Sequence, residues 1–441
     1  MNILNTPLGI TKPIRITTET LCVMAFILYF AQDAIRVLVA TAFSFLSADV
    51  VTWIMIVVMY MPLVLALIFD FQRMRRLVAT FLLLLLMVAA FFEITYLIHP
   101  EYASWYFEGS YPVLRWIFKP NRFLYASLFV LIMPSPKATI KALKIVGLLL
   151  LVYYTYRLVK AEYLGYWITT TTASGPQNAE YDLSYGYDHL FVFAIFFVCG
   201  MQEKKPLYFV LAGISIIEII LGGSRGPLLY IAVMAILLFL RYRKTINIKI
   251  RALMTLLIVL LAGICLVLGI EGSVVLLGTI LSKVLGTSSR TVQTLLGGTS
   301  SALDSSGRDQ LYAIALNMIK NGFWGYGAYG DRYVIGQTFW VGYSHNLFLE
   351  ILIDFGWIVG GILCIRIVVN SIKMLFFCKE DDWYVLFTVF FIGSMKLLSS
   401  GSFWFSEPFW GAIAVYYLYR REKKYSQKLT KGDQLELTAI K

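Results

Sequence analysis

The sequence predicts an all-α polytopic integral membrane protein, and three observations indicate this class. Hydrophobic residues make up 59% of the 441 residues, charged residues make up only 15%, and the mean hydropathy is +0.74. A soluble globule with a wetted surface does not have this composition. Runs with little charge recur along the chain, and most are long enough for a spanning helix, which needs roughly 20 apolar residues. Short segments of alternating polarity, typical of a membrane β-barrel, are absent from the sequence.

Twelve apolar runs are candidate membrane spans. They lie at residues 19–45, 51–69, 77–98, 123–135, 144–161, 188–202, 206–222, 226–240, 252–270, 345–369, 383–399 and 407–419. The run 123–135 is short for a hydrocarbon core about 30 Å thick. The first run follows Lys12 and Arg15 and has the pattern of an ordinary span rather than of a cleavable signal peptide.

About 12 transmembrane helices divide the chain into four parts. Residues 1–270 hold the first nine spans, 271–344 form a large, partly helical extracytoplasmic loop, 345–419 hold the last three spans, and 420–441 form a basic cytoplasmic tail. Two shorter outer segments, 99–122 and 162–187, are rich in aromatic and hydroxyl residues. Flat rings beside hydroxyl groups suit sugars, although an aromatic belt at the membrane interface has the same composition.

Lysine and arginine gather in the short loops and predict the orientation. The clusters are Arg73/Arg75/Arg76, Lys137/Lys141/Lys144, Lys204/Lys205, Arg241/Arg243/Lys244/Lys249/Arg251, Arg366/Lys373/Lys379 and the tail from Arg420. With twelve spans all six clusters fall on the side of the N-terminus, which the positive-inside bias places in the cytoplasm. We therefore expect a multi-pass protein of the cell inner (cytoplasmic) membrane with both termini cytoplasmic. The net charge of +12 then reflects topology and attraction to the lipid bilayer, and no nucleic acid partner is expected.

The outer loop contains a helix with an arginine at its start. Ser306 and Asp309 form a capping box, and Asn321-Gly322 ends the helix. One apolar face is expected from Leu311, Ile314, Ala315, Met318 and Ile319. Arg308 lies in the first turn, where the helix dipole disfavours a cation. It is either a surface arginine paired with Asp304 or Asp309, or part of a site.

Arg225 lies in a short break, Gly222 to Gly226, between two apolar runs, and Pro227 suits the start of the second helix. An arginine at membrane depth costs ~2.5–3.5 kcal/mol at the helix centre on insertion scales. Glu218, two turns earlier, offers a stretched ion pair, and a binding site is the other interpretation.

Arg225, Arg308 and His345 are expected on one face of the membrane. Two crossings, 226–240 and 252–270, separate Arg225 from His345, so the three side chains can meet at the outer end of the bundle. The planar fork of arginine binds phosphate oxygens bidentately, and a lipid-linked diphosphate carries its charge at this depth. Taken without the arginines, His345 is better interpreted as an interfacial residue whose neighbours, Ser344 and Asn346, cap the next helix.

Three motifs resemble the O-antigen ligase/Wzy polymerase superfamily, which are membrane glycosyltransferases of GT-C type. They are GGSRG between two spans, SGRDQLYAIALNMIKNGFWGYG in the outer loop, and SHNLFLEILIDFGWIVGGIL at the end of that loop. The resemblance covers roughly residues 205–365, whereas the remainder matches only in topology. The three motifs occur in order, which makes the pattern more specific than any one of them.

The resemblance implies transfer of a glycan from undecaprenyl diphosphate to an acceptor hydroxyl outside the cytoplasmic membrane. Arg225 and Arg308 match the diphosphate-binding arginines, and His345 matches the residue that assists proton transfer or the leaving group. Further candidate substrate-binding residues are Arg332, Tyr343, Asn346 and Glu350, and Asp354 is expected to make a contact within the bundle.

No metal and no cofactor are predicted. Arginines that neutralise a diphosphate make a metal unnecessary, and the single Glu180-Tyr181-Asp182 motif is a weak metal signal. Four of the five cysteines lie in expected spans, so we expect no disulfide framework.

The expected activity is that of a Wzy-type polymerase, metal-independent, whose donor and acceptor are both undecaprenyl diphosphate-linked oligosaccharides. The products are O-antigen, capsular polysaccharide or exopolysaccharide, and a chain-length regulator protein is a further expected partner. The alternatives are an O-antigen ligase that transfers the glycan to lipid A core, and a flippase or transporter for lipid-linked oligosaccharide. Against a transporter, the Gly222–Gly226 break has no counterpart in the first half of the chain. A binding-only scaffold is a further option.

Overall fold

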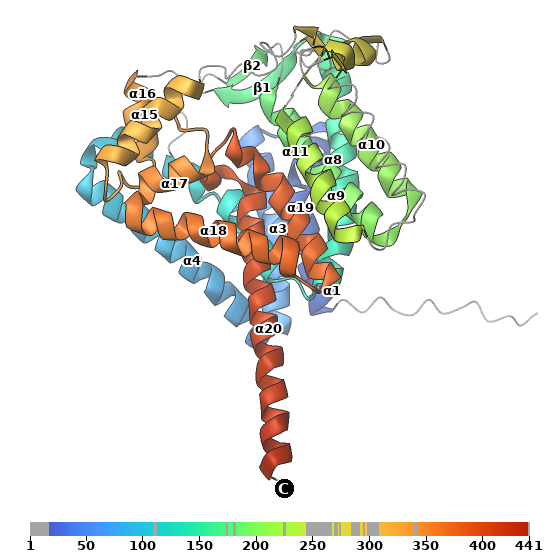
Figure 1. Ribbon diagram of the computed structural model, residues 1–441, viewed down its shortest axis with the longest axis vertical. Coiled ribbons are helices and arrows are strands. Elements are labelled where there is room, and N and C mark those ends of the chain that lie inside the picture. The colour runs from blue at the N-terminus through green and yellow to red at the C-terminus, as the bar shows by residue number, and fades with distance from the viewer. Residues whose placement is uncertain are drawn as a thin grey trace, which may run out of the picture.

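Most of the described chain is helical in the computed structural model (Figure 1). The structure describes residues 17–108, 113–172, 175–179, 182–223, 226–243, 308–338 and 342–439, and short stretches at 267–268, 272, 275–283, 292–293 and 296–297. The α-helices are α1 (Thr18–Phe30), α2 (Gln32–Ala42), α3 (Ala48–Phe69), α4 (Phe71–Ile98), α5 (Ala103–Phe107), α6 (Val113–Ile117), α7 (Ala126–Leu131), α8 (Pro136–Leu164), α9 (Leu183–Glu203), α10 (Pro206–Leu221), α11 (Gly226–Tyr242), α15 (Arg308–Asn321), α16 (Gly330–Thr338), α17 (Leu347–Phe355), α18 (Gly361–Ile372), α19 (Asp381–Ser394) and α20 (Glu407–Ala439). The 3-10 turns are η1 (Pro100–Tyr102), η2 (Phe123–Tyr125), η5 (Met395–Leu398) and η6 (Phe403–Phe405), and the π-helical turns are η3 (Gly356–Gly360) and η4 (Lys373–Phe377).

Five helices among the described residues are long and apolar enough to cross a membrane. They are α3, α4, α8, the Ser184–Glu203 part of α9, and the continuous helix Leu347–Phe377 that α17, η3, α18 and η4 form together. The first expected span consists of α1 and α2, whose axes are bent by 77° at Ala31. If this bent pair is one span, the candidate spans number six. The shorter apolar helices α10 and α11 follow. The chain is thus a helical membrane protein, and the total of about 12 spans remains a prediction. The expected span 252–270 lies almost entirely outside the described residues.

The expected span at 123–135 is wrong as a spanning helix. Residues 123–125 form the turn η2, and α7 has only six residues, which makes a helix about 9 Å long. Every residue of α7 is buried, and α7 packs against α1, α4 and α20. The apolar composition of this run therefore serves the core of the bundle instead of contact with lipid.

A β-hairpin is the one departure from an all-α architecture among the described residues. Strands β1 (Trp167–Thr172) and β2 (Gly175–Ala179) pair antiparallel, with Trp167 opposite Ala179 and an irregularity after Thr169. The hairpin lies in the expected outer segment 162–187, directly after Gly165, which ends α8 with a φ of +75°. Figure 1 shows it at the end of the molecule opposite the C-terminus.

Residues from three of the expected basic clusters meet at one end of the bundle. Lys144 and Lys205 both pair with Glu203, Lys137 pairs with Asp382, and Arg241 pairs with Asp381 and donates to the Cys378 carbonyl. Helix α20 continues through the expected tail and carries the C-terminus beyond the other helices in Figure 1. Basic residues that share one side of the membrane must lie at one end of the bundle, as these do. That this side is the cytoplasm stays a prediction.

Candidate active site

A polar segment leads directly into α17. The Asn346 side chain caps this helix, because its Oδ1 accepts hydrogen bonds from the backbone N–H groups of Phe348 and Leu349 at 3.0 and 3.3 Å. The Asn346 amide also donates to the Leu398 carbonyl oxygen at 3.1 Å. The capping role expected of the residues beside His345 therefore belongs to Asn346.

His345 has an uncommon backbone conformation. Its φ of +51° lies in the left-handed region, which residues other than glycine rarely adopt and which is common at functional sites. Its ring stacks on Tyr343 with 3.8 Å between centroids, and no described group bonds its buried Nδ1 atom. Burial, together with the positive charges of Arg308 and Arg332, lowers the pKa of His345 to about 4. The imidazole is therefore neutral near pH 7.

Arg332, in α16, is held between acidic and aromatic groups. Its Nη1 lies 3.0 Å from Asp331 Oδ1 and 3.1 Å from Glu350 Oε1. Its guanidinium lies over the rings of Tyr329 and Tyr343, with 4.1 and 5.0 Å to the centroids. Two carboxylates thus offset one positive charge, and the side chain is fixed and buried. A direct contact of Arg332 with substrate remains a prediction.

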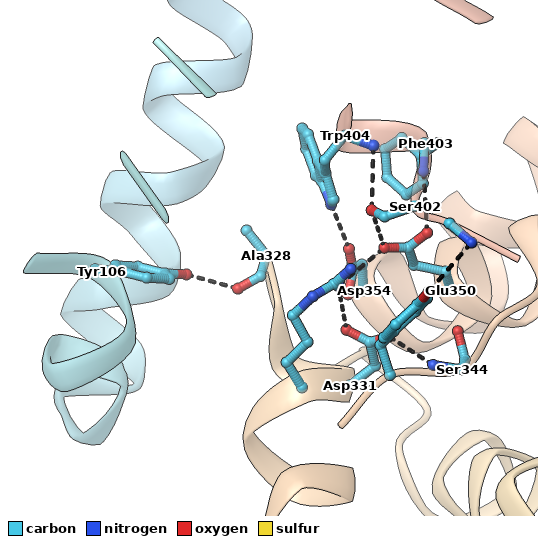
Figure 2. A network of polar contacts seen from close by, with 12 residues as sticks. Tyr106, Ala328, Asp331, Ser344, Glu350, Asp354, Ser402, Phe403 and Trp404 are labelled. Atoms are coloured by element: carbon cyan, nitrogen blue, oxygen red, sulfur yellow. Dashed lines mark hydrogen bonds and ion pairs between the residues drawn. The ribbon is translucent and has the colours of Figure 1, made fainter. Parts of the chain in front are cut away.

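Glu350 and Asp354, one turn apart on α17, hold the segment between α19 and α20 (Figure 2). Glu350 accepts a hydrogen bond from the Ser402 hydroxyl at 2.5 Å and another from the backbone N–H of Phe403 at 3.2 Å. Asp354 accepts from the indole N–H of Trp404 at 2.9 Å, which confirms its expected contact within the bundle. Both carboxylates are buried.

Sequence reasoning missed Ser402 and Trp404. They lie in residues 399–406, SSGSFWFS, between two expected spans. The backbone N–H of Gly401 donates to the Tyr343 hydroxyl at 3.3 Å, so this segment contacts the ring on which His345 stacks. The available signal was position along the chain, because the expected count of crossings that predicts an outer position for His345 predicts one for this segment too.

Arg308 is the first residue of α15, as expected. The buried face of α15 consists of Leu311, Ala315, Met318 and Ile319, and the helix ends at Asn321, which confirms the sequence pattern. Ser306 lies outside the described residues. The Arg308 charge acts on His345 and on Tyr230, so the guanidinium lies within electrostatic range of both. The Tyr230 hydroxyl is 2.6 Å from the Ser399 hydroxyl, at the start of the segment that Glu350 holds.

Arg225 lies outside the described residues, but the structure describes Gly226, which follows it. Gly226 lies against Tyr187, whose hydroxyl would be 2.0 Å from a Cβ at this position. The same hydroxyl is 3.3 Å from the Ser399 hydroxyl. The chain that leaves the Gly222–Gly226 break therefore abuts the segment 399–406, next to the surroundings of Arg308.

Two acidic residues considered in the sequence have other partners. Glu218, weighed as an ion-pair partner for Arg225, accepts a hydrogen bond from Thr155 at 2.6 Å and lies 3.1 Å from the Nε2 of His189. Asp182 pairs with Arg157 at 2.6 Å. The other two residues of the weak metal motif that contains Asp182 lie outside the described residues.

One part of the chain matches a known family. Residues 209–364 match the family model described as O-antigen ligase. This part of the chain is therefore similar to the O-antigen ligase family. The matched range includes Arg225, Arg308, Arg332, His345 and Glu350, and it ends before the segment 399–406. Members of the family are glycosyltransferase-like enzymes, ligases or polymerases. No curated protein and no solved structure matches the chain.

Proposed function

We propose that this protein is a Wzy-type polysaccharide polymerase of the inner membrane, acting on the extracytoplasmic face. It transfers a glycan from undecaprenyl diphosphate to a hydroxyl of another lipid-linked repeat unit. The observation that carries this proposal is the neutral His345, held on Tyr343 within electrostatic range of Arg308 and Arg332. The similarity of residues 209–364 to the O-antigen ligase family supports the reaction class.

The arginines serve the leaving group. The anomeric C–O bond of the donor breaks, and the diphosphate leaves with the bonding electrons. Arg308 and Arg225 stabilise the negative charge that develops on the diphosphate, through charge-assisted hydrogen bonds worth about 1.5–3 kcal/mol each. Donors that are already in place lower the barrier because they need no rearrangement during the reaction.

His345 serves the acceptor. Its neutral imidazole takes the proton from the acceptor hydroxyl as the oxygen forms the new glycosidic bond. In the free protein the neighbouring positive charges hold the His345 pKa low. A bound diphosphate offsets those charges, so the His345 pKa rises when the substrate is present and the imidazole becomes a better base.

The residues around His345 position it. Arg332 and Glu350 join α16 to α17, and Asn346 fixes the first turn of α17 directly after His345. We assign Arg332, Tyr343, Asn346 and Glu350 to the wall of the substrate site, with Tyr343 supporting the imidazole ring.

The description of the matching family favours one other candidate, an O-antigen ligase that uses the same donor but transfers the glycan to lipid A core. Purified protein in liposomes, supplied with undecaprenyl diphosphate-linked repeat units and with either a second repeat unit or lipid A core, separates the two. The polymerase proposal predicts longer lipid-linked glycans. Glycosylation of lipid A core alone would contradict it and support the ligase.

A translocation assay on the same liposomes tests whether the protein is a transporter instead. The enzyme proposal predicts that His345→Ala stops elongation and leaves any movement of the lipid-linked glycan across the bilayer unchanged. Loss of translocation in a protein that never elongates a glycan would overturn it.

A further inference from the structure

A polar cavity lies beside the segment that joins α19 to α20, and His345 is not among the residues that line it. Its volume is about 180 Å³, and α1, α2, α8 and α9 contribute to its walls. The charged side chains that line it are Asp33, Arg122, Asp188, Lys396 and Glu407. All five lie outside both the segment that carries the resemblance and the O-antigen ligase match. The cavity is therefore assigned by neither.

These charges pair with one another and stay accessible. Arg122 lies 3.1 Å from Asp33 and 3.9 Å from Glu407, and Lys396 lies 3.0 Å from Asp188. The five side chains keep between 20% and 37% of their accessible surface. Ion pairs that only join helices in a packed interior have almost no accessible surface, as the Arg332–Glu350 pair shows. Donors and acceptors in this cavity therefore remain free to bind a polar ligand.

Aromatic rings complete the lining. They are Phe30, Phe123, Tyr154, Tyr187, Phe191 and Phe405. A sugar ring offers apolar C–H faces that pack on aromatic rings, and hydroxyls that both donate and accept hydrogen bonds. Paired carboxylates and cations beside flat rings match both properties.

Charge and size narrow the ligand class. Three carboxylates and two cations give the lining a formal charge of −3 + 2 = −1, which disfavours a phosphate or diphosphate. The volume is below the roughly 300–1,000 Å³ of sites for drug-sized ligands. The cavity therefore suits one neutral or amino sugar ring rather than a whole repeat unit or its lipid diphosphate.

A chain of contacts links the cavity to the surroundings of His345. Tyr187 lines it and its hydroxyl lies 3.3 Å from the Ser399 hydroxyl, which in turn contacts Tyr230 near Arg308. Lys396 lies within electrostatic range of Tyr343, the residue on which His345 stacks. A glycan that reaches from the His345 site can therefore place a neighbouring sugar in the cavity.

We propose that the cavity lined by Asp33, Arg122, Asp188, Lys396 and Glu407 is a sugar subsite that holds one ring of the lipid-linked glycan. The inference rests on the proposed glycosyltransferase function and adds a place where the glycan, rather than its diphosphate, is recognised.

The test measures binding of two probes to the full chain in lipid nanodiscs. One probe is the repeat-unit oligosaccharide released from its lipid by mild acid, and the other is undecaprenyl diphosphate without sugar. The double variant Asp188→Asn/Lys396→Gln removes an ion pair of the cavity without leaving an unpaired charge. The matched control, Lys144→Gln/Glu203→Gln, removes an ion pair at the opposite end of the bundle.

In the cavity variant we expect the Kd for the oligosaccharide and the KM for elongation each to rise at least tenfold. We expect kcat to stay within threefold of the wild-type value and binding of undecaprenyl diphosphate to be unchanged. The control variant should match the wild type. Glu407→Gln, which keeps its shape, provides a second variant if the first does not fold, and it should weaken oligosaccharide binding at least threefold. The subsite proposal would be overturned if the folded variants bound the oligosaccharide with the wild-type Kd. It would also be overturned if the variants lost affinity for both probes equally.

The two proposals fail separately. Selective loss of oligosaccharide binding in a protein that never elongates a glycan would preserve the subsite and contradict the polymerase. Normal elongation with an unchanged KM in the variants would preserve the polymerase and contradict the subsite.

Discussion

Arg332 and Glu350 form a buried ion pair between α16 and α17, with 3.1 Å between Nη1 and Oε1. Arg332 belongs to the expected outer loop, and Glu350 belongs to the continuous helix Leu347–Phe377 that follows it. Glu350 also holds Ser402, from the segment before α20. The pair therefore joins three parts of the chain that are distant in sequence, directly beside His345.

Glu350→Ala should destabilise the protein strongly. The change leaves the buried Arg332 with Asp331 as its remaining carboxylate partner, and breaking a buried pair costs about 3–5 kcal/mol. Thermal unfolding in detergent should show a clearly lower Tm. Lys205→Ala, which removes an exposed ion pair with Glu203, is the control and should change Tm little. Equal Tm values for Glu350→Ala and the wild type would contradict the role given to the pair.

Trp404→Phe should destabilise the protein by about 1–3 kcal/mol, because the buried Asp354 carboxylate loses the hydrogen bond that the Trp404 indole N–H donates to it. Trp324→Phe is a matched control, since Trp324 is 82% exposed. The midpoint of thermal unfolding measures both. If the two variants unfold alike, the Trp404–Asp354 bond does not hold the segment 399–406.

Asn346→Ala should loosen the first turn of α17 at a cost of about 1 kcal/mol, because the N–H groups of Phe348 and Leu349 lose their cap. Hydrogen exchange at the start of α17 should become faster. Asn346→Asp keeps an oxygen acceptor and should restore slow exchange. Fast exchange in both variants would show that the side-chain cap is not what orders this turn.

His345 should titrate near pH 4 in the free protein. Burial and the charges of Arg308 and Arg332 lower its pKa from about 6.5. A histidine whose folded-state pKa is lowered contributes stability that is present above the unfolded-state pKa and is lost as pH falls from 6.5 towards 4. The acidic limb of kcat/KM should therefore lie near pH 4. Arg308→Gln should move the titration, followed by NMR, to higher pH, and a wild-type titration at 6.5 would contradict this environment.

Local patterns in the sequence predicted the elements that depend on local interactions. The apolar face of α15 and its end at Asn321 follow from helical spacing, and the start of α17 follows from the ability of Asn346 to cap a helix. The membrane class follows from composition. These features need no knowledge of distant parts of the chain.

Long-range partners could not be predicted in the same way. The apolar run 123–135 satisfies a composition rule for spans, yet α7 is buried by α1, α4 and α20, and composition does not distinguish lipid from protein surroundings. Glu350 has Ser402 as a partner 52 residues away, and no spacing rule links them. The candidate residues Arg308, Arg332, Tyr343, His345, Asn346 and Glu350 were chosen from sequence, whereas the contacts of Asp331 and of the segment 399–406 with them became visible only in the structure.

The most direct test of the account compares the initial rate of glycan elongation by His345→Ala with that by His99→Ala in the reconstituted assay. His99 is a partly exposed histidine that pairs with Glu101, so its loss controls for removing an imidazole. Loss of a catalytic base typically lowers the rate by about 10²–10⁴-fold. The account predicts such a loss for His345→Ala and a near wild-type rate for His99→Ala. Elongation by His345→Ala at the wild-type rate would contradict it.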